Sequence, residues 1–171
     1  MSGGIGPSIV AVVLSIFLFI PGAVNDSIQP LSSTVATAES ASYSELEEED
    51  IARATQSFID TLVQNSDENY RVTRYDNKEE LLDAFDSIAV EKAVKPYVDY
   101  YFQEKNGDLY IKPTELPPWF KPNQSYEIDQ IDNTHAKVQQ SNETSLYGNY
   151  TITIDFLYKN EQWVIQDVHY Q

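Results

Sequence analysis

The chain of 171 residues contains no cysteine. Disulfide bonds, thiol nucleophiles and cysteine-ligated metals are therefore excluded, and the fold must be stabilised by packing. Glycine is scarce, with six residues, which leaves little room for a glycine-rich loop that binds phosphate. The two histidines, His135 and His169, are distant in the sequence and form no metal-binding motif. We therefore expect neither a metal ion nor a cofactor.

Positive charge is also scarce. The chain has 11 Lys and Arg residues against 27 Asp and Glu residues, which gives a net charge of -16. Such a surface repels nucleic acid and anionic lipid. We therefore expect no nucleic-acid partner, and contact with a membrane only through an apolar segment near the N-terminus. An unknown protein, a peptide or a small molecule remains as the partner.

No apolar run approaches the about 20 residues that a membrane-spanning helix needs. The longest is the uncharged segment of 12 residues at 9–20, "IVAVVLSIFLFI", which is followed by Pro21 and Gly22. Its length is typical of the apolar part of a secretory signal, and Ala36 and Ala38 have the small-x-small spacing of a cleavage site. Residues 1–38 are thus predicted to be a signal peptide or an uncleaved membrane anchor, and residues 39–44 a linker. The expected location is extracytoplasmic, either secreted or anchored by residues 9–20.

Three amphipathic helices are predicted between residues 44 and 107. Ser44, Asp76 and Ser87 are the predicted N-terminal caps, and Asn106-Gly107 is predicted to end the third helix. Pro96 should kink that helix or split it. The first helix has apolar residues at three- and four-residue steps, which predicts one buried stripe: Ile51, Ala54, Phe58, Ile59 and Leu62.

After Gly107 the pattern becomes extended or alternating. Residues 108–113 are predicted to form a short strand, and residues 114–124 a proline-rich loop that carries Trp119 and Phe120. Two strands are predicted around Asp132-Asn133, and two longer ones around Lys159-Asn160. In the first of these longer strands the apolar residues 150, 152, 154, 156 and 158 share one face, so one side of the sheet should be buried. The sequence therefore predicts an α+β domain with an antiparallel meander.

The last strand pair ends in "EQWVIQDVHY", where Trp163 and Ile165 form a W-x-I motif. Three helices followed by such a meander resemble the nuclear transport factor 2-like superfamily. This resemblance implies a single domain over residues 45–171, with the N-terminal helices packed on a curved antiparallel sheet in a cone-like, cystatin-like roll whose wide end often opens as a pocket. More narrowly, "DNKEELLDAFDSI" and "YFQEKNGDLYIKPTELPPWF" resemble an uncharacterised family of secreted proteins from spore-forming Gram-positive bacteria, which has no known activity.

Strict alternation along the last strand places Trp163, Ile165, Asp167 and His169 on one face. If Trp163 faces the interior of the cone, Asp167 and His169 approach its mouth. There they either end a strand in solvent or form a histidine general base oriented by a carboxylate. The aromatic side chains of Trp119 and Phe120 in the proline-rich loop either form a recognition surface or fold back over the core. The candidate ligand-binding residues are Tyr150, Trp163, Asp167, His169, Trp119 and Phe120.

The leading hypothesis is an exported, non-catalytic binding or accessory domain at the bacterial cell envelope. The alternative is a small-molecule isomerase or hydrolase that uses His169 and Asp167 in an apolar pocket of the cone. A third hypothesis is a homodimer that buries the sheet face of Thr151, Thr153 and Asp155. Membership of the superfamily does not decide among these, because one fold supports many functions.

Overall fold

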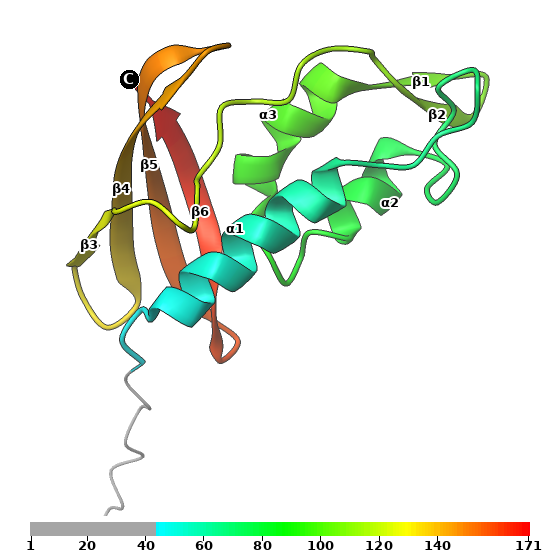
Figure 1. Cartoon of the computed structure of the whole chain (residues 1–171). Helices are drawn as coiled ribbons and strands as arrows, with labels where there is room; N and C mark the ends of the chain where they lie inside the picture. The colour runs from blue at the N-terminus through cyan, green and yellow to red at the C-terminus, as the bar shows by residue number, and fades with distance from the viewer. Residues whose placement is uncertain (1–43) are drawn as a thin grey trace, which may run out of the picture. The chain divides into compact units, whose positions relative to one another are not determined.

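Three helices precede six strands in the part of the chain that the computed structural model describes, residues 44–171 (Figure 1). These residues belong to one compact unit, Glu39–Gln171. The predicted signal or anchor at 1–38, and the linker up to residue 43, lie outside the described residues. The elements are α1 (Glu48–Leu62), α2 (Lys78–Asp83), α3 (Glu91–Tyr101), β1 (Phe102–Lys105), β2 (Asp108–Ile111), β3 (Glu127–Gln130), β4 (His135–Thr144), β5 (Gly148–Lys159) and β6 (Gln162–Tyr170). The α+β class is thereby confirmed.

Strands β3 to β6 form an antiparallel sheet in sequence order, which confirms the predicted meander. Strands β1 and β2 form a separate hairpin. The turn between β5 and β6 consists of Asn160 and Glu161, whose φ angles are 51° and 64°. Positive φ at both central residues gives the two-residue turn whose twist matches the flanking strands.

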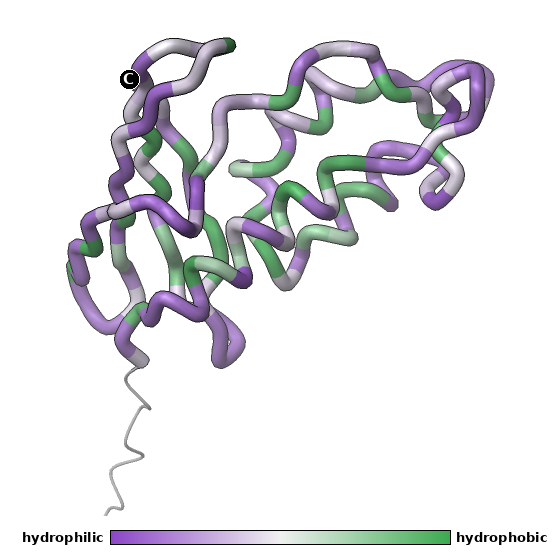
Figure 2. Tube along the Cα trace, viewed as in Figure 1, coloured by the Kyte–Doolittle hydropathy of each residue, from purple (hydrophilic) through white to green (hydrophobic). Residues whose placement is uncertain are grey.

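The core lies between the helices and one face of the sheet. On β5, Tyr150, Ile152, Ile154 and Phe156 are buried, as the alternating pattern predicts. Hydrophobic residues gather where the helices lie against the sheet, and the turn between β5 and β6 is hydrophilic (Figure 2). The helices add a further set of buried residues to this cluster: Ile51, Ala54, Phe58, Leu62, Val94 and Val98.

Helices α1 and α2 start later than predicted, α1 beside a tertiary contact and α2 with a local cap. Helix α1 begins after Glu47, not Ser44, and the backbone N–H of Leu46 donates to the Gln130 side chain at 3.0 Å. Helix α2 is capped by Asn77, one residue after Asp76, and its side chain accepts from the N–H of Glu80. Ser87 caps no helix.

Helix α3 differs from its prediction at both ends. Ile88 to Val90 run beside β6, where Val90 N–H donates to the Ile165 carbonyl at 2.9 Å, so the helix starts only at Glu91. It ends at Tyr101, and Asn106-Gly107 is instead the turn between β1 and β2. Pro96 does not split the helix, because its exposed ring removes only one backbone hydrogen bond.

Candidate functional site

A β-bulge in β6 changes the predicted site. Asp155 of β5 pairs with Asp167, but the next β5 residue, Phe156, pairs with Ile165, so Gln166 is an extra residue. The extra residue inverts the alternation that follows it. The prediction that Asp167 and His169 share a face with Trp163 and Ile165 is therefore wrong.

After the bulge, Val168 and Tyr170 lie opposite Ile154 and Ile152, on the side of the sheet that packs against the helices. His169 lies opposite Thr153, on the other side. Its side chain is 55% exposed, and its Nε2 is 3.3 Å from a carboxylate oxygen of Asp155. His169 thus ends a strand in solvent and does not enter the interior.

Asp167 makes a different contact. Its carboxylate is 3.1 Å from the Lys92 ammonium of α3 and accepts from the N–H of Val168 at 2.9 Å. Partial burial raises the pKa of Asp167, but the hydrogen bonds from Lys92 and Val168 outweigh burial and hold this pKa below its ordinary value. Asp167 is therefore an ionised carboxylate paired with a lysine, and it does not orient His169.

The other candidate ligand-binding residues do not lie together at one opening of the fold. Trp163 is fully buried opposite Tyr158, at the hairpin end of β6, whereas Tyr150 is buried near the start of β5. The Tyr150 hydroxyl donates to the carbonyl of Trp119 at 2.8 Å. Tyr150 and Trp163 therefore lie at opposite ends of the core.

The loop rings fold back over the core, which is the second of the two predicted alternatives. Trp119 stacks on Phe58 with ring centroids 4.7 Å apart, and its indole N–H donates to the Thr55 carbonyl at 3.0 Å. Phe120 is buried against Tyr126. Phe120 is thus buried and Trp119 half-buried, and both line a hollow of about 210 Å³ beside α1.

A cavity of about 370 Å³ lies between α3 and the end of β6. Four tyrosines and one ion pair are among the residues that line it: Tyr97, Tyr100, Tyr101, Tyr170, Lys92 and Asp167. The hydroxyls of Tyr97 and Tyr170 are 3.0 Å apart and share a hydrogen bond. The bulge creates this contact, because without the extra residue Tyr170 would point away from α3.

Three tyrosines of this cavity, Tyr97, Tyr101 and Tyr170, remain neutral phenols near pH 7. Burial raises the pKa of Tyr101 to about 12, and nearby Tyr147 adds to the shift. Burial also raises the pKa values of Tyr97 and Tyr170 above the ordinary range. The rings therefore offer π faces and hydroxyl groups, with no phenolate to act as a base.

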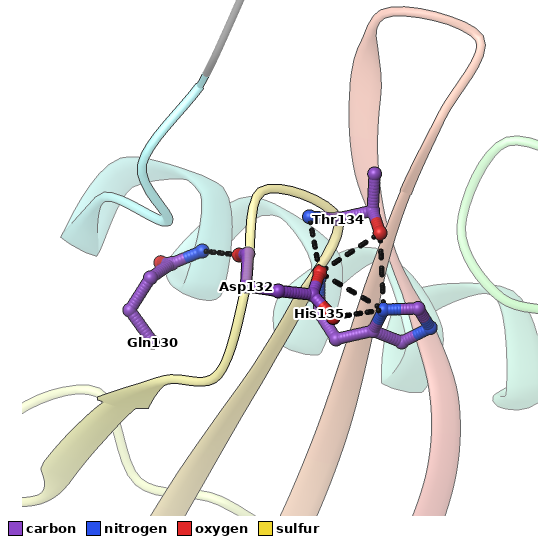
Figure 3. Close-up of polar contacts among 4 residues, drawn as sticks. All are labelled: Gln130, Asp132, Thr134 and His135. Carbon is purple, nitrogen blue, oxygen red and sulfur yellow. Dashed lines mark hydrogen bonds and ion pairs between the residues drawn. The ribbon is translucent and has the colours of Figure 1, made fainter.

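His135, the second histidine, is the first residue of β4 and flanks the turn between β3 and β4. Figure 3 shows the Asp132 carboxylate facing Thr134 and His135. It accepts from the backbone N–H groups of Thr134 at 2.7 Å and His135 at 2.9 Å, and the imidazole Nδ1 lies 3.1 Å away. This is a turn built on an aspartate, and it closes the hairpin.

The turn predicts a pH-dependent stability. The Thr134 N–H, the His135 side chain and the Thr134 hydroxyl lower the pKa of Asp132 to about 2. A lowered pKa stabilises the fold above the unfolded pKa of about 3.9 and loses this effect as the pH falls through the folded value. We expect Asp132→Asn to lower the melting temperature at pH 5, with the difference closing between about pH 4 and pH 2.

The matched control is Asp129→Asn, at an exposed position of the neighbouring strand. Thermal unfolding of the wild type and both variants from pH 5 to pH 2 checks the prediction. A melting-temperature difference for Asp132→Asn that stays constant down to pH 2 contradicts it.

Within residues 44–171, no group of three or more His, Cys, Asp or Glu side chains is placed to hold a metal ion. Among the helices of that same part, none has the length and apolar character needed to cross a membrane. No family model matches the chain, and a search of curated proteins finds no match either.

Sequence reasoning missed the tyrosine cavity as a site. Tyr97 and Tyr101 fit the apolar spacing of a helix and therefore indicate core residues. The available signal was the count of 12 tyrosines, three of which fall between residues 97 and 101. That signal does not locate Tyr170, because only the bulge turns it toward α3.

Proposed function

We propose that this chain is an exported, non-catalytic binding or accessory domain of a bacterial cell envelope, with the cavity between α3 and β6 as its ligand site. The observation that supports binding is the cavity itself. Its volume of about 370 Å³ falls within the range of about 300–1,000 Å³ of small-molecule sites. Export is supported by the apolar segment at 9–20 and the Ala36-x-Ala38 spacing.

For the finer fold, we propose the cone-like roll of the nuclear transport factor 2-like superfamily. Its support is the order of the elements, with helices first and an antiparallel meander after them. Further support comes from α1 and α3, which both contact β6, so the helices cover one face of the sheet. A pocket between a helix and the sheet fits this architecture.

The enzyme alternative finds less support in the geometry. The cavity lining contains no histidine, serine or threonine, and its carboxylate, Asp167, is paired with Lys92. His169 lies on the opposite face of the sheet. A general base of the expected kind therefore does not face the cavity. The homodimer through Thr151, Thr153 and Asp155 stays a prediction.

The binding proposal predicts that small organic probes enter this cavity. Choline, phenol and cyclohexanol are added separately, at millimolar concentration, to the full chain labelled for NMR. We expect at least one probe to shift resonances of Ala93, Tyr97 and Val168, because these residues line the cavity. If none of the three probes shifts them, the proposed site is wrong.

A pair of valine variants provides the control. Val168→Trp fills the cavity from β6, whereas Val63→Trp adds the same ring at an exposed position after α1. We expect probe affinity to fall at least about 10-fold in the first variant and to stay unchanged in the second, because lost volume excludes the ligand. Thermal unfolding verifies that both variants fold. Equal probe affinity in the two variants would mean that the probes bind outside this cavity.

A further inference from the structure

The walls of the cavity favour a positively charged ligand. Tyrosine rings carry negative potential on their faces, and a cation within about 6 Å of a ring centroid is attracted to it. Four tyrosines from α3 and β6 line this one space. Because burial raises the pKa values of Tyr97, Tyr101 and Tyr170, these three rings stay neutral over the physiological pH range.

One of these rings already receives a cation from the chain itself. The Lys112 ammonium lies 5.9 Å from the centroid of Tyr100, which also lines the cavity. Tyr100 is 61% exposed, so its ring is accessible from solvent. The geometry of a cation above a tyrosine face therefore occurs at the edge of the site.

Of the charges beside the rings, the Asp167 carboxylate favours a cation, and the Lys92 and Lys112 ammonium groups compete with it. Asp167 supplies a carboxylate, and its Lys92 partner is 83% exposed. An exposed ion pair contributes little to stability, so a ligand cation can replace the Lys92 ammonium at little cost. The net charge of -16 also raises the local concentration of cations and repels anions.

The polar groups of the cavity argue for an alkylated ammonium group. A bare ammonium has three N–H donors that need acceptors once water is removed. The Tyr97 and Tyr170 hydroxyls share one hydrogen bond, which leaves fewer acceptors for such donors, and the side chains of Ala93, Pro96 and Val168 offer only apolar surface. A quaternary ammonium, whose nitrogen carries four alkyl groups, has no N–H donor, so it needs no hydrogen bonds and packs against rings and apolar side chains.

We propose that the cavity between α3 and β6 binds an organic cation with a quaternary ammonium group, held by the tyrosine rings and the Asp167 carboxylate. This inference rests on the proposed function, because it names the ligand class of the same site. A neutral ligand of the same shape is the competing outcome.

The test compares choline with 3,3-dimethylbutan-1-ol, which has the same shape but carries carbon in place of the charged nitrogen. Both are titrated into the full chain and followed by NMR at the cavity residues. We expect choline to bind at least about 10-fold more tightly, because only its cation is attracted to the tyrosine rings. If the alcohol binds equally well or better, the cation inference is overturned while the binding site stands. If neither compound binds but phenol or cyclohexanol does, the inference is also overturned and the site again stands. If no probe binds, both fail.

Variants of exposed residues separate the ring from the hydroxyl. Tyr100→Phe keeps the aromatic face, and we expect choline affinity to change less than about 2-fold, whereas Tyr100→Leu should weaken it about 3- to 10-fold.

Lys92→Met removes the competing ammonium and should strengthen choline binding, while Asp167→Asn should weaken it. Weaker choline binding in Lys92→Met overturns the assigned role of the ion pair. An equal loss of choline affinity in Tyr100→Phe and Tyr100→Leu overturns the assigned role of the ring.

Discussion

Replacing Phe58 by alanine is expected to lower the free energy of unfolding by about 3–5 kcal/mol. Phe58 is fully buried in α1, at the centre of an aromatic cluster. Its ring centroid lies 5.2 Å from those of Phe85 and Tyr97, and 4.7 Å from that of Trp119. The truncated side chain leaves a cavity whose rigid ring walls cannot collapse, so both the transfer energy and the packing energy are lost.

Two variants calibrate this loss. Phe58→Leu refills part of the volume and should cost less than the alanine variant. Val63→Ala removes methyl groups from a side chain that is 50% exposed, just after α1, and should change stability by no more than about 0.5 kcal/mol. Urea unfolding of the three variants measures the differences. A loss below about 1 kcal/mol for Phe58→Ala would contradict the central position of this ring.

Replacing Gln140 by leucine should cost about 2–4 kcal/mol although it adds an apolar residue to a buried position. The Gln140 amide accepts from the Lys121 N–H at 2.8 Å and donates to the Lys121 carbonyl at 2.9 Å. It also donates to the Gln124 carbonyl at 3.2 Å. Gln140 is 1% exposed, so leucine leaves these loop groups without partners in a buried place.

Gln139→Leu is the matched control, because it changes the same residue type on the opposite face of β4. Its side chain is exposed and makes one long hydrogen bond, of 3.5 Å, to Thr153. We expect a change of no more than about 0.5 kcal/mol. Hydrogen exchange of the Lys121 amide should accelerate in Gln140→Leu only. If that amide exchanges at the wild-type rate, Gln140 does not hold the loop.

The elements that the sequence predicts well are those whose signals are local. The alternation along β5 and the turns around Asp132 and Asn160 depend on neighbouring residues, and the structure confirms them. The helix starts depend on distant contacts. Ser87 has good capping chemistry, but pairing of Ile88 and Val90 with Ile165 of β6 keeps the chain extended past it.

The candidate site was less predictable because it depends on one extra residue. Gln166 is neither glycine nor proline, so no local marker distinguishes the bulge from a regular strand. Regular alternation therefore predicts His169 on the inner face and Tyr170 on the outer face, the reverse of the structure. The same bulge turns His169, the candidate catalytic histidine, away from the cavity. It also brings the Tyr170 hydroxyl to 3.0 Å from the Tyr97 hydroxyl, so that both side chains line the cavity.

A crystal structure of the full chain soaked in choline, phenol and cyclohexanol tests the ligand cavity most directly. The account predicts a bound probe between α3 and β6, in contact with Tyr97 and Val168, with the outer face of the sheet beside Asp155 and His169 free of it. Probes that gather at Asp155 and His169 while the space between Tyr97 and Tyr170 holds only water would contradict it.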